Sequence, residues 1–434
     1  MALLLLAGWS LFAFAGAYFW TTVPLAAGAL VLGAWVRPSV GDRERWLLDF
    51  AIVVALVVAG FQLVPLPARA RAALSPAAVA VDRALRFDAS IRPAALTVDP
   101  EATAEAIVVM TAVALVFWSA RAIFDGRSPR RTIFGIAMCG MAASAIGLAQ
   151  HLTSPRLLYW IWQPVNRSAM PFTPFVNRND LAGWLIMGLP LAAGYMLARL
   201  DERRREGLVN VERVLDPTGV WLSAAICVMT AGLVSTLSRS GLMAAAAAAI
   251  ALVLLSRGRL HGAGRAWLIA GVGFVSLIAI AYVNVGALMT RVGETVSTGV
   301  GGRREIWLVT AGMIRDFWLA GVGVGAYPRA MSVYQPPHVF SFNHAHDEYL
   351  QILSEGGVLL MLPALVAAIA GGREIARQLR ADRTPSYWMR AGATSALVAA
   401  AVQAIWETTI HLPANAVLFA LCAAVAMHRR SSHM

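Results

Sequence analysis

Residues 241–256 read GLMAAAAAAIALVLLS, an apolar run without a charged side chain. Comparable runs of about 15 to 21 residues recur along the chain, close to the length at which a helix crosses a hydrocarbon core roughly 30 Å thick. Inside lipid, backbone polar groups must be satisfied within the segment, which favours helices. A transmembrane barrel would need short segments of alternating polarity, and residues 241–256 and 266–286 do not alternate. With a hydrophobic fraction of 59%, these runs predict an all-α integral membrane protein.

We predict about twelve transmembrane helices, which form a single transmembrane domain over residues 1–434. Residues 1–20 lack the basic start of a signal peptide, and hydrophobicity resumes directly after them, so we interpret them as a first span. The predicted spans are 3–20, 22–36, 47–64, 102–120, 132–152, 181–200, 220–237, 241–256, 266–286, 357–371, 391–410 and 414–427.

Arginine alone sets the orientation, because the sequence contains no lysine. With the amino terminus in the cytoplasm, most arginines fall in inner segments, as the positive-inside rule requires. Residues 65–101 and 287–356 are then two large outer loops, and the second lies between the ninth and tenth spans. Within it, Ile306 to Phe317 show helical spacing of apolar residues, which predicts an amphipathic helix. The net charge of +12 therefore predicts contact with anionic membrane lipids rather than with nucleic acid.

The second outer loop ends in a dense group of ionisable residues. Residues 342–351 read FNHAHDEYLQ, with two histidines and two acids in a chain that is otherwise largely apolar. Membrane proteins place such clusters where water, substrate or protons are handled. The predicted topology brings four further polar groups to the same membrane face: Asn177 to Asp180, Ser238 to Ser240, Gly302 to Arg304, and Glu407 with His411. This convergence predicts a site at the outer interface.

Each of these groups also has a simpler interpretation. An arginine at the end of a span is often an interfacial anchor, and His344 and His346 could cap a helix or bind a metal ion. The run Gly321 to Gly325 resembles a phosphate loop, but no strand or lysine supports that reading, so a flexible turn is favoured. A transporter would need charges near the bilayer midplane, and the predicted spans have few. A purely structural role would not explain why five polar groups come together at one membrane face.

The residue types at this face suit transfer of a sugar from a polyprenyl diphosphate. Arginine donates bidentate hydrogen bonds to phosphate oxygens and stays charged at any working pH. Histidine, with a reference pKa of about 6.5, can remove a proton from an acceptor hydroxyl near neutral pH. Arginines that stabilise a departing diphosphate could replace the metal ion used by many soluble glycosyltransferases.

Five motifs occur in series: FVNRN at 175–179, SRSG at 238–241, GRREIW at 302–307, GVGVG at 321–325 and HDEYLQ at 346–351. In order and spacing this series resembles the O-antigen ligase and polymerase superfamily. The resemblance implies a multi-helix fold with a large periplasmic loop, acting without a metal on glycans linked to undecaprenyl diphosphate. Arg239 and Arg303 match the family's essential arginines, and His346 matches its histidine. Asp347 departs from the family pattern, which commonly has Asn there.

From the residues and the resemblance together, we expect an O-antigen ligase in the bacterial inner membrane, with residues 65–101 and 287–356 in the periplasm. It would move a glycan from undecaprenyl diphosphate to lipid A–core, and the alternative is a polymerase whose acceptor is a second lipid-linked glycan. We expect no cofactor and no metal ion. The expected catalytic residues are Arg239, Arg303 and His346, and the expected substrate-binding residues are Asn177, Arg178, Asn179, Arg304, His344, Glu348, Tyr349 and Glu407.

Overall fold

The computed structural model describes residues 1–85, 94–165, 169–206, 216–257, 259, 300–335 and 342–429, and this part of the chain is helical, with three isolated β-bridges and no strand. The α-helices are α1 (Ala2–Phe12), α2 (Phe19–Val36), α3 (Trp46–Phe61), α4 (Ala68–Leu74), α5 (Pro76–Leu85), α6 (Pro100–Gly126), α7 (Arg130–Thr153), α8 (Arg178–Arg205), α9 (Pro217–Ser235), α10 (Arg239–Ser256), α12 (Val300–Asp316), α13 (Tyr327–Tyr334), α14 (Glu348–Ala381), α15 (Ser386–Gln403) and α16 (Pro413–Met427).

Among the described helices, 7 are long and apolar enough to cross a membrane: α2, α6, α7, α8, α9, α10 and α14. The shorter helices α1, α3 and α16 are also apolar. The predicted class, an all-helical membrane protein, is therefore confirmed. The predicted span 266–286 lies outside the described residues, so the total of about twelve stays a prediction.

The first predicted span, 3–20, is broken in the structure. Helix α1 ends at Phe12, and α2 begins at Phe19. Between them Gly16 has a φ of +80°, and the ring of Pro413 lies so close that no side chain would fit at this position. Hydropathy averages over such a turn, which is why the sequence suggested one continuous span.

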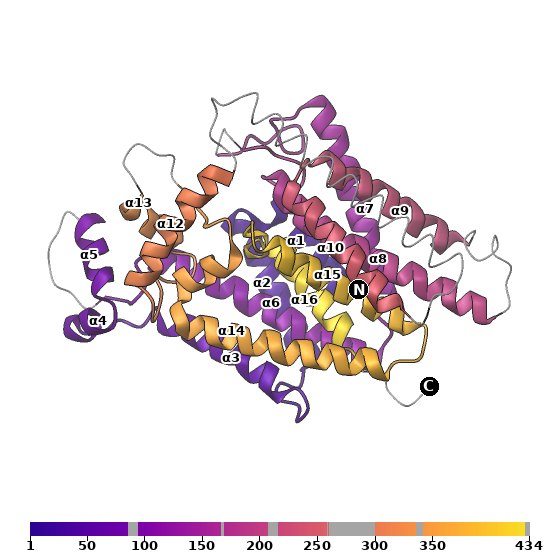
Figure 1. Cartoon of the computed structure of the whole chain (residues 1–434), viewed down its shortest axis with the longest axis horizontal. Coiled ribbons are helices and arrows are strands. Elements are labelled where there is room, and N and C mark those ends of the chain that lie inside the picture. Colours follow the sequence, from indigo (N-terminus) through magenta and orange to yellow (C-terminus); the bar gives the residue numbers. More distant parts are fainter. Residues whose placement is uncertain are drawn as a thin grey trace.

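Helix α8 packs against α7, α9, α10 and α15, which lie around it in the right-hand part of Figure 1. Small residues allow its close packing, and α10 approaches it at Gly241, opposite Ala182. Most side chains of α8 between Leu181 and Ala198 are buried. The start of α8 is therefore fixed against several neighbours, and its N-cap and first turn together carry three of the predicted site residues.

The two predicted outer loops fold together into one layer at one end of the bundle. A separate apolar core joins α5, from the first loop, to α12 and α13, from the second, through Val81, Ile306, Met313 and Tyr327. The predicted amphipathic helix is confirmed as α12, whose Ile306, Met313 and Phe317 are buried. Within this layer α12 packs against α14.

The glycine run Gly321 to Gly325 forms a tightly packed turn. Gly323 has a φ of +112° and lies against Thr97, where no side chain would fit. The amide of Val322 donates to Ser354 O (2.9 Å), that of Gly323 to Glu355 O (3.0 Å), and that of Val324 to the Gln62 side chain (2.9 Å). Because these amides are already bonded within the protein, the turn is not built as a phosphate-binding loop.

Candidate functional site

Three helix N-termini meet around residues 404–412, the linker between α15 and α16. The amide of Glu348, at the start of α14, donates to Ala404 O (2.8 Å), and Asn415, in the first turn of α16, donates to Asp180 O in α8 (3.1 Å). The N-terminus of α10 lies beside that of α8. Helix N-termini carry partial positive charge, so this end of the bundle favours an anionic ligand.

Glu407 connects three of the predicted residues. Its side chain is only 4% exposed, and it lies in the 404–412 linker. Arg303 of α12 pairs with Glu407 Oε1 at 2.5 Å, and Asn179 of α8 donates to the same oxygen at 3.0 Å. Nδ1 of His346 lies 3.4 Å from Glu407 Oε2. One buried carboxylate therefore holds together groups that are distant in sequence.

His346 lies in a backbone conformation that favours glycine, with a φ of +51°. Histidine is one of the residue types that tolerate this region, and such conformations cluster at functional sites. Its ring remains partly exposed, with Nδ1 directed at Glu407. A proton on Nδ1 would be held by Glu407, which leaves Nε2 free to accept a proton from a substrate.

The structure shows why Asp347 can stand where the family commonly has Asn. It is the N-cap of α14, and its carboxylate accepts a hydrogen bond from the amide of Leu350 (2.9 Å). Asp and Asn are about equally good at this position. The substitution therefore preserves the local geometry that precedes α14 and places His346.

The other predicted arginines are available for a ligand. Arg178 is partly exposed, and Arg239 and Arg304 are exposed. Within the described residues, none of their side chains has an ion-pair partner, in contrast to Arg303. Arg239 is the first residue of α10, directly after the N-cap Ser238. Asn177 caps α8 in the same way and accepts from the amide of Asn179 (3.0 Å).

Arg239→Lys is expected to reduce glycan transfer by roughly tenfold or more while the protein still folds, because lysine keeps the charge but loses the bidentate geometry. The rate should be measured on purified protein, with folding checked by thermal unfolding. Arg380→Lys, at an exposed arginine near the C-terminus of α14, is the matched control. Equal rates for Arg239→Lys and the wild type would contradict a role in diphosphate binding and would indicate that Arg239 is an interfacial anchor.

A second charged group lies beside the Glu407 cluster. His411, at the end of the 404–412 linker, has Nδ1 2.8 Å from Glu348 Oε1 and Nε2 3.5 Å from Glu355 Oε2. Both glutamates are buried in α14. Partial burial disfavours the charged imidazolium, but the two carboxylates outweigh it and hold the pKa of His411 well above its usual range. The charged His411 therefore ties the linker that carries Glu407 to α14.

His344 faces this second group, with its ring centroid 6.4 Å from that of His411. The residue is exposed, yet desolvation by the protein atoms near its ring, together with the positive charges of His411 and His346, lowers the pKa of His344 below its usual value. It is therefore neutral near pH 7. Tyr349 points elsewhere, and its hydroxyl donates to Ala401 O on α15 (2.9 Å), which anchors α14 to α15.

The sequence interpretation missed Glu355 and the buried amides that support both clusters. Gln351 accepts from the amide of Ala345 (2.7 Å) and donates to Glu355 (2.8 Å), which fixes the chain just before His346. Gln403 accepts from Thr409 (3.2 Å) within the linker region. One signal was present, because Glu348, Gln351 and Glu355 follow i, i+3, i+7 spacing and share one helix face.

The His411 contacts predict a pH dependence. A pKa raised by carboxylates means that the pairing is complete at neutral pH and is lost as the pH rises through that raised pKa. Activity should therefore fall on the alkaline side, where Glu348 and Glu355 are left without their cation. In Glu355→Gln one counter-charge is gone, so the alkaline limb of the pH–rate profile should move to lower pH. Glu44→Gln, at the other end of the bundle, should leave the profile unchanged, and superimposable Glu355→Gln and wild-type profiles would contradict this role.

We compared the chain with known proteins, and one match covers the segment that contains the three expected catalytic residues. No curated protein matches the chain. A family model described as O-antigen ligase matches residues 224–365. The matched segment contains Arg239, Arg303 and His346, whereas Asn179 and Glu407 lie outside it. The resemblance to the O-antigen ligase and polymerase superfamily is thus confirmed by the match of residues 224–365 to the O-antigen ligase family model.

Proposed function

We propose that this protein is a membrane glycosyltransferase that moves a glycan from undecaprenyl diphosphate to lipid A–core at the periplasmic face of the inner membrane. Its family supports the general class, because members are glycosyltransferase-like membrane enzymes. The observation that carries the proposal is the Glu407 cluster, in which one buried carboxylate joins Arg303, Asn179 and His346. An anchoring role for these residues would not require that arrangement.

The charges around the cluster suit a diphosphate. Arg178, Arg239 and Arg304 have no counter-ion within the described residues, and the N-termini of α8, α10, α14 and α16 add partial positive charge. These groups would bind the donor diphosphate and stabilise the negative charge that develops as it leaves. Arg303 is already paired with Glu407. Besides its expected catalytic role, it would therefore hold α12 in place against Glu407.

The chemistry then follows from the geometry of His346. Nε2 would take the proton from the acceptor hydroxyl, while Glu407 holds Nδ1 and stabilises the imidazolium that forms. The acceptor oxygen forms a bond to the anomeric carbon of the glycan as the bond from that carbon to the diphosphate oxygen breaks. The products are the extended acceptor and undecaprenyl diphosphate, and the proton later leaves His346 for solvent.

Ligase and polymerase share this donor chemistry and differ in the acceptor. Purified protein should be incubated with undecaprenyl-diphosphate glycan in two parallel reactions, one with lipid A–core and one with the donor alone. A ligase joins the glycan to lipid A–core and leaves the donor unextended. Longer lipid-linked glycan in the donor-only reaction would instead identify a polymerase, and the absence of product in both reactions would count against the proposal.

We expect transfer to continue in the presence of a chelator, because arginines and helix N-termini take the role of a metal ion in this proposal. Within the described residues, no three His, Cys, Asp or Glu side chains are placed to share a metal ion. The assay compares rates with and without EDTA after dialysis. Inhibition that added zinc or magnesium reverses would show that His344 and His346 act through a metal.

A further inference from the structure

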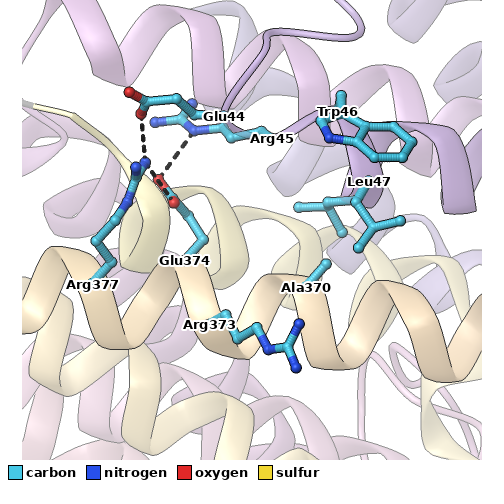
Figure 2. A pocket seen from close by; sticks show the side chains of 9 residues that line it. Glu44, Arg45, Trp46, Leu47, Ala370, Arg373, Glu374 and Arg377 are labelled. Atoms are coloured by element: carbon cyan, nitrogen blue, oxygen red, sulfur yellow. Dashed lines mark hydrogen bonds and ion pairs between the residues drawn. The ribbon is translucent and has the colours of Figure 1, made fainter.

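The end of the molecule opposite the candidate site contains a cavity of about 290 Å³ between α3 and α14 (Figure 2). Helix α14 begins at the site with Glu348, and the cavity lies toward its other end, at Ala370 to Arg377. Trp46, at the start of α3, lines this cavity and also a neighbouring one of about 270 Å³. The Trp46 side chain is exposed.

Among the described residues, one charged side chain that lines this cavity has no ion-pair partner. Arg45 pairs with Asp125 (2.8 Å) and Glu374 (3.3 Å), and Arg377 pairs with Glu44 and Glu374 (both 2.7 Å). Arg373 is exposed and has no ion-pair partner within the described residues. In Figure 2 its side chain extends away from the ion-paired group. The other charged residues that line the cavity are engaged in ion pairs, so the guanidinium of Arg373 is the one that remains to attract an anion among the described residues.

Two exposed apolar rows lead to this cavity. On α3 the row is Trp46, Phe50, Val53 and Val57, and on α14 it is Leu362, Leu365 and Ile369, with Arg373 one turn further on. The spacing places each row on one face of its helix. The two helices pack against each other along their length (Figure 1). An amphiphile whose anionic head contacts Arg373 could therefore place its acyl chains along these rows.

We propose that this cavity binds an anionic phospholipid, with the phosphate at Arg373 and the glycerol region beside Trp46. One unpaired arginine matches the single negative charge of a phosphatidylglycerol. Tryptophan is enriched at the headgroup level, and arginine-rich ends face the leaflet that carries anionic lipid. This end of α14 is arginine-rich, with Arg373, Arg377 and Arg380 close together in sequence. Arg205 of α8 donates a hydrogen bond to the backbone carbonyl of Arg383, just beyond α14 (3.5 Å). The site is independent of glycan transfer.

Native mass spectrometry of the full-length protein in detergent tests this proposal, with phosphatidylglycerol and phosphatidylcholine of identical acyl chains as probes. Phosphatidylglycerol should bind more tightly, and Arg373→Gln should weaken its binding by roughly tenfold or more, because a charge-assisted hydrogen bond is lost. Arg373→Lys should retain part of the preference, and Trp46→Ala should weaken the binding of both lipids.

Arg380→Gln is the matched control, because Arg380 is also exposed on α14 near the same end but lies outside the cavity. It should bind phosphatidylglycerol as the wild type does. Equal binding of the two lipids by the wild type, or equal losses in Arg373→Gln and Arg380→Gln, would overturn the proposal. Displacement of phosphatidylglycerol by inorganic phosphate would also overturn it, since the ligand would then be a free anion.

Discussion

His346→Ala is expected to lower glycan transfer by roughly 10² to 10⁴-fold, the usual contribution of a general base. His346 is the only histidine within the described residues whose ring contacts Glu407, and its Nε2 is left free by that contact. The loss should appear in kcat, because the proton is removed only as the acceptor attacks. Initial rates at saturating donor and acceptor measure it directly.

His344→Ala is the matched control for this loss. His344 lies two residues away in the same loop, so a general disturbance of the loop would affect both variants alike. Its ring faces His411 rather than Glu407. We therefore expect a smaller loss in His344→Ala than in His346→Ala. Equal losses in the two variants would show that the loop, and not the base, is what each substitution damages.

Glu407→Gln is expected to reduce transfer by roughly 10²-fold or more, although the side chain keeps its size and its burial. The amide oxygen can still accept from Arg303 and Asn179, but the amide nitrogen then faces His346 Nδ1. That nitrogen is a donor, so it favours the tautomer with the proton on Nε2, which cannot act as a base. Arg303 also loses its charge partner.

The control for Glu407→Gln is Glu374→Gln, which removes a buried glutamate that pairs with Arg45 at the opposite end of α14. Both variants lose a buried carboxylate, so both can lose stability, and rates should be compared per folded molecule. Of these two glutamates only Glu407 contacts His346, so only Glu407→Gln should lower the rate per folded molecule. Wild-type rates in Glu407→Gln would remove Glu407 from the mechanism.

The sequence predicted much of this arrangement because membrane helices are set by local composition. The apolar runs predicted α6, α8 and α10 near their observed positions, and the amphipathic spacing predicted α12. The break between α1 and α2 was missed, because it depends on contact between Gly16 and Pro413, which are far apart in the chain. Hydropathy contains no information about that contact.

In the candidate site, too, the sequence predicted the residues but not their contacts. Motif order selected Arg239, Arg303 and His346, and topology placed Glu407 at the same face. The contacts among these residues depend on tertiary packing, because Glu407 is 61 residues from His346 and 104 residues from Arg303 in the sequence. Glu355 was not predicted as a site residue, because it lies within an apolar helix. Its partner, His411, is distant in the sequence and is seen only in the structure.

The most direct test of the central claim is release of undecaprenyl diphosphate by purified protein supplied with lipid-linked glycan and lipid A–core. The wild type should form undecaprenyl diphosphate and glycosylated lipid A–core in equal amounts, with EDTA present, while His346→Ala and Glu407→Gln should form little of either. If His346→Ala and Glu407→Gln release undecaprenyl diphosphate as fast as the wild type, the Glu407 cluster is not the site of transfer.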